Sequence, residues 1–191
     1  PLVIAGGTSC VNPGPMSDFL DLMILGEGEE VDPEVLELYR KARNEGWSKH
    51  RFLVEASHIE GVFVPSLYEE TYNPDGTLAA FTPLDGAPAR VRKRIIEDMD
   101  SVYFPTNPIV PSTEIVHDRV NVELFRGCIR GCRFCQAGYV YRPVRAKKPE
   151  TVARQGIELL KNTGYQEATL MSLSSSDYRS LEQACDAMLE W

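Results

Sequence analysis

Short apolar runs that end in glycine mark the start of the chain. PLVIAGG and, further on, LMILG from Leu22 to Gly26 each predict a short buried strand, and Met16 to Asp21 predicts a short helix between them. The acidic residues Glu27 to Glu30 predict a turn after the second strand. The order strand, helix, strand indicates the end of an alternating α/β domain, in which ligands approach the backbone at strand ends.

Helical spacing, turn residues and prolines organise the middle of the chain. Asp32 as a cap and Pro33 at the first helical position predict a helix that ends at Gly46, and a second short helix is expected from Lys49 to His58. Two strand-like runs flank Asn73-Pro74-Asp75-Gly76 and predict a β-hairpin. The proline-rich stretch YFPTNPIVPS then indicates an extended connector between domains.

Two pairs of strand and helix follow this connector. VNVELFRG predicts a strand, Pro149 begins a helix that Gly164 closes, EATLMSLSSS predicts a second strand, and Asp177 to Trp191 predicts a second helix. This order implies parallel β/α units, whose sites lie at the carboxyl ends of the strands. The segment RGCIRGCRFCQAG and the segment from Ser174 to Asp177 both fall at such ends.

Composition narrows the classes of function. The formal net charge of -8 argues against a general affinity for nucleic acid, although residues 126–148 are strongly basic and form either a solvated loop or a surface for an anionic ligand, a cluster or RNA. The sequence has no apolar run of about 18 residues and no charged-then-apolar leader, so it predicts neither a membrane span nor a signal peptide. Five cysteines, three of them within residues 128–135, fit a reducing compartment and a metal or cluster site better than a disulfide framework.

The three clustered cysteines carry the most specific chemistry in the sequence. Cys128, Cys132 and Cys135 are spaced C-x3-C-x2-C, and three thiolates on one loop can hold three irons of a four-iron, four-sulfide cluster while the fourth iron stays open to another ligand. Gly127 and Gly131 permit the backbone conformations that such a loop requires. The flanking arginines favour thiolate over thiol and offset the negative charge of a thiolate-bound cluster.

Two other functions would use the same cysteines. A structural zinc site takes four protein ligands and often uses paired two-cysteine knuckles, which this sequence lacks, and neither His117 nor Cys185 has the local spacing of a fourth ligand. The zinc alternative is a structural module that binds nucleic acid through the basic stretch from Arg126 to Lys148. The other alternative is a scaffold that binds the cluster without turnover.

The cysteine motif resembles that of a known enzyme family. Cys128, Cys132 and Cys135, with Phe134 directly before the last cysteine, follow a predicted strand and precede a predicted helix, which is similar to the signature of radical S-adenosylmethionine (radical SAM) enzymes. The resemblance implies a [4Fe-4S] cluster whose open iron is chelated by the amino and carboxylate groups of S-adenosylmethionine. It also implies reductive cleavage of this cofactor to a 5′-deoxyadenosyl radical that abstracts hydrogen from a substrate, with a flavodoxin or ferredoxin as the reductant.

The resemblance implies roles for five further residues. In the family, the residue before the third cysteine packs near the adenine, and here this residue is Phe134; a plain core position is the alternative. The family's segment after the second strand meets the methionine amino group, often through Gly-Gly-Glu, whereas this chain has Ser174, Ser175, Ser176 and Asp177 there. Hydroxyls and a carboxylate can accept from an ammonium group, and the alternative for Asp177 is a helix N-cap.

A second resemblance divides the chain into three parts. AGG, then NPGP, then LMILGEGEE is similar to the end of the cobalamin-binding-type domain that precedes many radical SAM enzymes. Residues 1–31 would be the C-terminal part of a doubly wound, Rossmann-like domain, residues 32–118 a connector with helices and a β-hairpin, and residues 119–191 the first β/α units of a partial TIM-like barrel. Cobalamin binding is one interpretation of Gly6-Gly7, and a Gly-Gly strand end of any α/β domain is the other.

The two ends of the chain complete the prediction. The chain begins with a strand at Pro1 and stops at Trp191 inside an amphipathic run, so we interpret it as a fragment. We expect a cytoplasmic enzyme with no membrane partner, whose reaction is methyl or methylthio transfer to RNA or protein.

Overall fold

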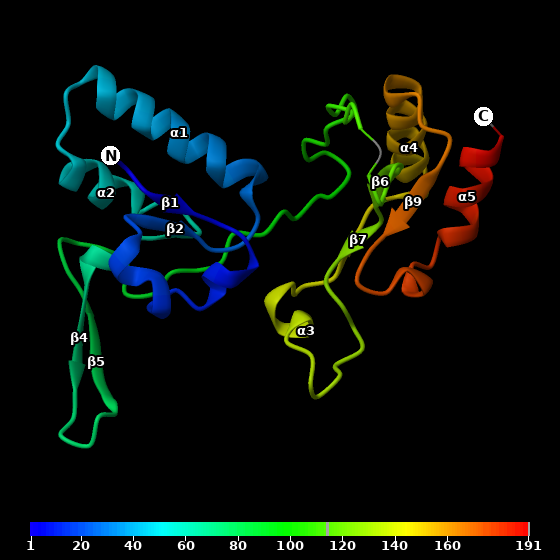
Figure 1. The fold of residues 1–191 in the computed structure, drawn as a ribbon. Helices are drawn as coiled ribbons and strands as arrows, with labels where there is room; N and C mark the ends of the chain where they lie inside the picture. Colours follow the sequence, from blue (N-terminus) through cyan, green and yellow to red (C-terminus); the bar gives the residue numbers. More distant parts are fainter. Residues whose placement is uncertain (114, 191) are drawn as a thin grey trace. The chain divides into compact units, whose positions relative to one another are not determined.

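The chain folds into two compact units of mixed helices and strands (Figure 1). The computed structural model describes residues 1–113 and 115–190 and divides into Pro1–Ile96 and Glu97–Trp191. Each unit combines helices with small sheets of two or three strands, which confirms the predicted α/β class. The division of the chain at residues 31 and 118 stays a prediction.

A three-stranded sheet forms the centre of the N-terminal unit. Its strands are β1 (Ile4–Ala5), β2 (Leu22–Ile24) and β3 (Val62–Phe63), with β1 parallel and β3 antiparallel to β2. All three residues of β2 are buried, as its apolar run predicts. The strands predicted in PLVIAGG and LMILG are therefore confirmed.

Two 3-10 helices connect β1 to β2. They are η1 (Thr8–Val11) and η2 (Gly14–Phe19). The second occupies most of the segment in which a short helix was expected, from Met16 to Asp21. Pro15 lies in the first turn of η2, where a missing N–H donor costs no helical hydrogen bond.

Helix α1 (Gly28–Asn44) begins earlier than predicted. The turn expected at Glu27 to Glu30 is wrong, because these acidic residues lead into the first helical turn, where carboxylates interact favourably with the helix dipole. Arg94, which is distant in the sequence, also pairs with carboxylates of this part of the helix. The guanidinium of Arg94 binds Glu30 at 2.7 Å and Glu34 at 2.8 Å, one helical turn apart.

The other boundaries of the two N-terminal helices follow from local signals. Pro33 lies inside α1 and not at its first position as predicted, but the helix ends just before Gly46, which has a φ of +66°. Helix α2 (Lys49–Ala56) starts where predicted, because the Ser48 hydroxyl accepts a hydrogen bond from the Arg51 N–H at 3.1 Å.

The core of the N-terminal unit is apolar and a β-hairpin projects from the unit (Figure 1). The hairpin consists of β4 (Tyr68–Tyr72) and β5 (Leu78–Pro83), which follow η3 (Pro65–Leu67). Its turn is the predicted one, with the Asn73 N–H donating to the Thr77 carbonyl at 2.8 Å. The fully or nearly buried core residues include Leu22, Ile24, Val31, Val35, Phe52, Leu53, Val62 and Leu67.

A parallel pair of strands forms the centre of the C-terminal unit. Strand β6 (Val120–Glu123) pairs with β9 (Ala168–Met171), which confirms the predicted parallel arrangement. Helix α4 (Pro149–Thr163) packs against β6 and against α5 (Leu181–Leu189). Gly164 closes α4 in the left-handed conformation, as its position in the sequence predicts.

Two elements predicted as continuous in this unit each form two separate elements in the structure. VNVELFRG is not one strand, because after Leu124 the chain leaves β9 and forms β7 (Phe125–Arg126), which pairs antiparallel with β8 (Arg145–Ala146). The short helix α3 (Ala137–Val140) lies between β7 and β8. The helix expected from Asp177 begins four residues later, after the 3-10 helix η4 (Ser175–Asp177).

Candidate functional site

The three clustered cysteines lie on residues 127–144, between β7 and β8, which we call the cysteine loop. Its base is closed by the pairing of Phe125 with Ala146 and of Arg126 with Arg145. Gly127 has a φ of +94°, and a Cβ atom there would lie 2.9 Å from the Pro143 carbonyl oxygen. A glycine is therefore required where the two sides of the loop approach each other.

All three thiols of the cysteine loop are free. Cys128 and Cys135 are half-buried and Cys132 is exposed. The Cys135 N–H donates to the Cys132 carbonyl at 3.0 Å, and Gly131, with a φ of +62°, turns the chain just before Cys132. The loop thus carries three free thiols within one short, turned segment.

The donor set fits an iron–sulfur cluster by its chemistry. Thiolates are the ligands of such clusters, and residues 128–135 supply three of them. Within residues 1–113 and 115–190, however, no three His, Cys, Asp or Glu side chains converge on a common point as metal ligands. This also applies to His117 and Cys185, the fourth ligands considered for zinc. Ligation by Cys128, Cys132 and Cys135 therefore requires rotation of their side chains or movement of the loop.

The serine-rich segment after β9 is a compact turn. The hydroxyls of Ser172 and Ser175 lie 3.1 Å apart, and the Ser175 hydroxyl donates to the Leu170 carbonyl at 3.3 Å. The Asp177 N–H donates to the Ser174 carbonyl at 2.8 Å. These bonds fix the turn at the carboxyl end of β9, and the Asp177 carboxylate faces the cysteine loop.

Asp177 pairs with an arginine of the cysteine loop. The Arg130 Nε donates to Asp177 Oδ2 at 2.8 Å, and a second guanidinium N–H donates to Oδ1. The hydrogen bonds from Arg130 and from the Ser174 hydroxyl hold the pKa of the Asp177 carboxyl below its ordinary value. The helix N-cap interpretation of Asp177 is wrong, because Ser180 occupies that position and the carboxylate is turned to Arg130.

One cavity brings part of the predicted site together. It has a volume of about 400 Å³ and is lined by Cys128, Ser174 and Asp177, three of the predicted site residues. The side chains of Phe125 and Ile129 add apolar wall. The cavity thus combines the Cys128 thiol, the Ser174 hydroxyl and the Asp177 carboxylate with apolar side chains.

The remaining predicted residues lie outside this cavity. Ser175 and Ser176 belong to η4 but do not line the cavity, and the same holds for Cys132, Cys135 and Phe134 among the residues described. Phe134 is 93% exposed, so the interpretation of Phe134 as a core residue is wrong. Sequence reasoning missed the specific role of Arg130, whose only signal was its positive charge between two cysteines.

Several cations of the basic stretch are bound within the C-terminal unit. Lys147 is 3% exposed, and its ammonium donates to the Gln155 amide oxygen at 2.8 Å and lies 4.3 Å from the centre of the Phe104 ring. Arg133 and Arg142 are exposed. The ion pairs of the stretch include Arg126 with Glu123, Arg130 with Asp177 and Lys148 with Asp100.

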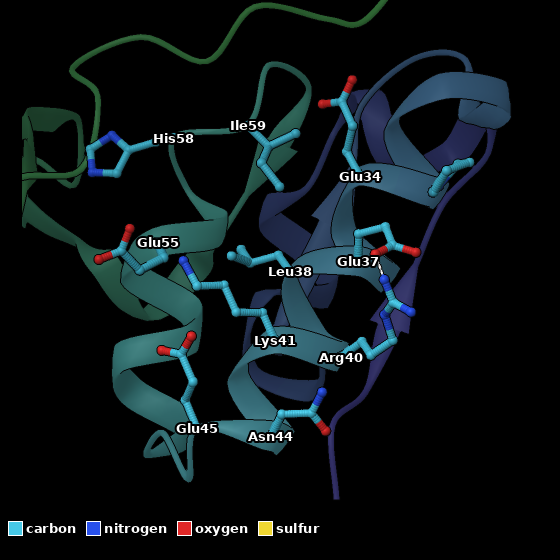
Figure 2. Close-up of a pocket in the computed structure, with 11 residues that line it drawn as sticks. Glu34, Glu37, Leu38, Arg40, Lys41, Asn44, Glu45, Glu55, His58 and Ile59 are labelled. Atoms are coloured by element: carbon cyan, nitrogen blue, oxygen red, sulfur yellow. Dashed lines mark hydrogen bonds and ion pairs between the residues drawn. The ribbon is translucent and has the colours of Figure 1, made fainter.

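A larger groove of about 840 Å³ lies between α1 and α2 in the N-terminal unit (Figure 2). Figure 2 shows Leu38 and Ile59 between the helices, and Glu37 bound to Arg40 on the outer side of α1. No cysteine lines this groove in the described part of the chain. The charged side chains along it belong to the solvated faces of two amphipathic helices. Size alone therefore does not identify the site, and the smaller cavity carries the chemistry.

The described helices also bear on the predicted absence of a membrane span. None of the described helices is both long enough and apolar enough to cross a bilayer.

Comparisons with known proteins give a separate indication of function. Residues 1–65 match the family model described as radical SAM proteins, N-terminal. The chain is also similar to the uncharacterized protein MJ0966 of Methanocaldococcus jannaschii, with 26% identity over 188 residues, which make up 97% of this chain and 34% of that protein. The chain thus spans about a third of the length of this curated relative.

The family match and the cysteine motif lie in different parts of the chain. The match covers residues 1–65, whereas the motif begins at Cys128, so each is an observation in its own right. Both point to the same superfamily. Together they support an enzyme of the radical SAM superfamily.

Proposed function

We propose that the chain is part of a radical SAM enzyme in which Cys128, Cys132 and Cys135 bind a [4Fe-4S] cluster. The observation that carries the proposal is the cavity beside the cysteine loop, because it joins Cys128 to Ser174 and Asp177 at the carboxyl ends of two parallel strands. The family match of residues 1–65 supports the same superfamily. When bound, the cluster and S-adenosylmethionine supply one-electron cleavage of the sulfonium to a 5′-deoxyadenosyl radical.

The residues of the chain have distinct roles in this proposal. The three thiolates hold the cluster, and Gly131 lets the loop turn between the first two of them. The Asp177 carboxylate, whose oxygens each keep a lone pair beside Arg130, and the hydroxyls of Ser174, Ser175 and Ser176 accept hydrogen bonds from the methionine ammonium group. Phe125 and Tyr178, both buried, exclude water from one side of the cavity. Phe134 is free of the core and stacks on the adenine.

We further propose the larger architecture of which this chain is a part. The parallel pair β6 and β9, with α4 and α5, forms the first two units of a partial TIM-like barrel. Residues 1–31 are the end of a doubly wound, cobalamin-binding-like domain, a proposal supported by the parallel pairing of β1 and β2. Cobalamin is accordingly a proposed second cofactor.

The reaction and the partners belong to the same proposal. We propose methyl or methylthio transfer to RNA or protein, which the exposed cations Arg133 and Arg142 of the cysteine loop support as a surface for a large anionic substrate. A flavodoxin or ferredoxin supplies the electron. The enzyme works in the cytoplasm, without a membrane partner, as the free thiols support.

Anaerobic reconstitution of the full-length protein with iron and sulfide tests the cluster. We expect a brown protein with three-cysteine ligation, an EPR signal after reduction that changes when S-adenosylmethionine is added, and formation of 5′-deoxyadenosine. The triple variant C128A/C132A/C135A should lose the cluster, and C185A, which removes a thiol outside the loop, should keep it. A triple variant that keeps the full cluster would overturn the assignment. A colourless protein with stoichiometric zinc would favour the zinc module instead.

A further inference from the structure

We propose that the ion pair between Arg130 and Asp177 is a latch that holds the cysteine loop against the turn after β9. In this role both are positioning residues, which hold the backbone that carries Cys128 and Cys132, so that rotation of the two side chains is what remains for ligation. The identity of the ligand that these thiols bind rests on the proposed function. The latch itself is a property of the metal-free chain.

The latch matters because the segment from Cys128 to Cys135 has few other described contacts with the rest of the unit. The pairing of β7 with β8 and the close approach at Gly127 fix only the base of the loop. Farther out, Ile129 is 73% exposed and Phe134 is 93% exposed, so both side chains lie mostly in solvent. Among the residues described between Cys128 and Cys135, Arg130 is the side chain with an ion pair outside the loop.

The geometry of the pair suits a latch. Two guanidinium N–H groups meet the two carboxylate oxygens, and this bidentate arrangement fixes direction as well as distance. The Asp177 side chain is 16% exposed and belongs to a turn held by its own hydrogen bonds, whereas the Arg130 side chain is 57% exposed. Asp177 is therefore the rigidly held partner of the ion pair, and Arg130 is the partner carried by the cysteine loop.

The consequence for the site follows from the position of Arg130 in the sequence. It lies two residues from Cys128 and two residues from Cys132, so fixing its side chain constrains the backbone on both sides. Cys128 and Asp177 line the same cavity. The latch thus holds together two segments that line the same cavity and whose paired residues are 47 positions apart.

Hydrogen exchange on the metal-free, full-length protein tests the latch without any cofactor. The reporters are the amides of Tyr139, Val140 and Tyr141, which donate within the loop to carbonyls of Gln136 and Ala137. Arg130→Gln and Asp177→Asn should each raise their exchange rates about fivefold, the upper range for a partly exposed ion pair. Arg133→Gln, a matched change at an exposed arginine of the same loop, should leave the rates unchanged.

The exchanged pair R130D/D177R distinguishes a latch from a general structural role. It should restore most of the protection from exchange that either single variant loses. Arg130→Lys, which keeps the charge but not the bidentate geometry, should retain only part of the wild-type protection. Equal rates in R130Q and R133Q would overturn the proposal. So would faster exchange that extends to Val122 of β6, because this would indicate loss of the whole unit.

A second measurement uses the reconstituted protein. A chelator should remove iron about fivefold faster from the Arg130→Gln variant than from the wild type or from R133Q. Removal at the wild-type rate would show that the pair does not position the thiols. A wild-type protein that takes up no iron would defeat the proposed function, whereas the exchange experiment would still decide whether the latch exists.

Discussion

The ends of β2 and β7 look alike in the sequence but have different roles in the structure. Each strand is followed within two residues by a glycine with positive φ, +114° at Gly26 and +94° at Gly127. At both glycines another backbone segment comes close: an added Cβ would lie 2.1 Å from the Arg94 carbonyl oxygen in the first case and 2.9 Å from the Pro143 carbonyl oxygen in the second.

The difference lies in the side chains that follow each glycine. After Gly26 the chain enters α1, whose residues Glu30 and Glu34 bind Arg94, so this strand end is closed by its own unit. After Gly127 the chain enters the cysteine loop, where three thiols stay free. A glycine at a strand end therefore indicates close backbone approach in both units, and only the residues after it separate a structural closure from a chemical site.

The largest expected effect is at the closed strand end. Gly26→Ala forces a side chain into a backbone contact of 2.1 Å and keeps a φ that L residues avoid, so we expect a loss of about 3 kcal/mol or more in the free energy of unfolding of the N-terminal unit. Denaturant titration followed by hydrogen exchange at β2 measures it. Gly46→Ala, at a positive φ with open space around it, is the matched control and should cost about 1 kcal/mol. Equal losses in the two variants would show that the close approach does not matter.

At the open strand end the expected effect is smaller and local. Gly127→Ala should cost about 2 kcal/mol, because its nearest contacts are 2.9 Å away and belong to a loop that can shift. The reporter is the amide of Lys147, which donates to the Leu124 carbonyl at 2.9 Å beside the loop base. Gly131→Ala, at a positive φ in open space, should change this amide little. If G127A instead unfolds the whole C-terminal unit, the two strand ends do not differ as described.

Elements defined by neighbouring residues could be predicted from the sequence. The hairpin follows from Asn73 to Gly76, the end of α4 follows from Gly164, and the buried strand β2 follows from its unbroken apolar run. In each case the residues that cause the structure are adjacent in the chain, so the sequence contains the whole signal. The parallel pairing of β6 with β9 followed from the order of elements between them.

Features that depend on distant residues could not be predicted. The first turn of α1 is paired with Arg94, 64 residues from Glu30, and the Asp177 carboxylate is paired with Arg130, 47 residues away. The sequence identified Cys128, Ser174 and Asp177 as candidate site residues, but the cavity that they share exists only once β6 and β9 are paired. The periodic pattern also could not show that Leu124 divides one predicted strand into two.

The carboxylate of Asp21, directly before β2, should make the stability of the N-terminal unit depend on pH. Asp21 accepts from the Val3 N–H at 2.7 Å and binds the Lys49 ammonium at 2.7 Å, which joins β1, β2 and α2. Burial alone would raise the pKa of the Asp21 carboxyl, but the hydrogen bonds from Lys49 and Val3 outweigh burial and hold this pKa below its ordinary value. The stabilisation is therefore present above the unfolded pKa of about 3.9 and is lost as the pH falls through the lower folded value.

Asp21→Asn should accordingly lose about 1 kcal/mol of unfolding free energy at neutral pH. The difference from the wild type should shrink as the pH falls below about 4, because the Asp21 carboxylate of the unfolded wild type then takes up a proton before that of the folded protein does. Unfolding curves recorded across the acid range measure this. Asp18→Asn, at an exposed neighbouring carboxylate, is the control and should run parallel to the wild type. A constant difference between D21N and the wild type at all pH values would contradict the charge argument.

The smallest expected effect on stability is within the open region itself. Phe134 is 93% exposed and Phe125 is 5% exposed, although the two residues are of one type and nine positions apart. Phe125→Ala should cost about 3 kcal/mol because it leaves a cavity in the core, whereas Phe134→Ala should change the free energy of unfolding by less than about 0.5 kcal/mol. In the reconstituted protein the same Phe134→Ala change should weaken binding of S-adenosylmethionine about fivefold, since the adenine loses its aromatic partner. A loss of about 2 kcal/mol in the metal-free F134A variant would mean that the cysteine loop is packed like the end of β2, and the distinction between a closed and an open strand end would not hold.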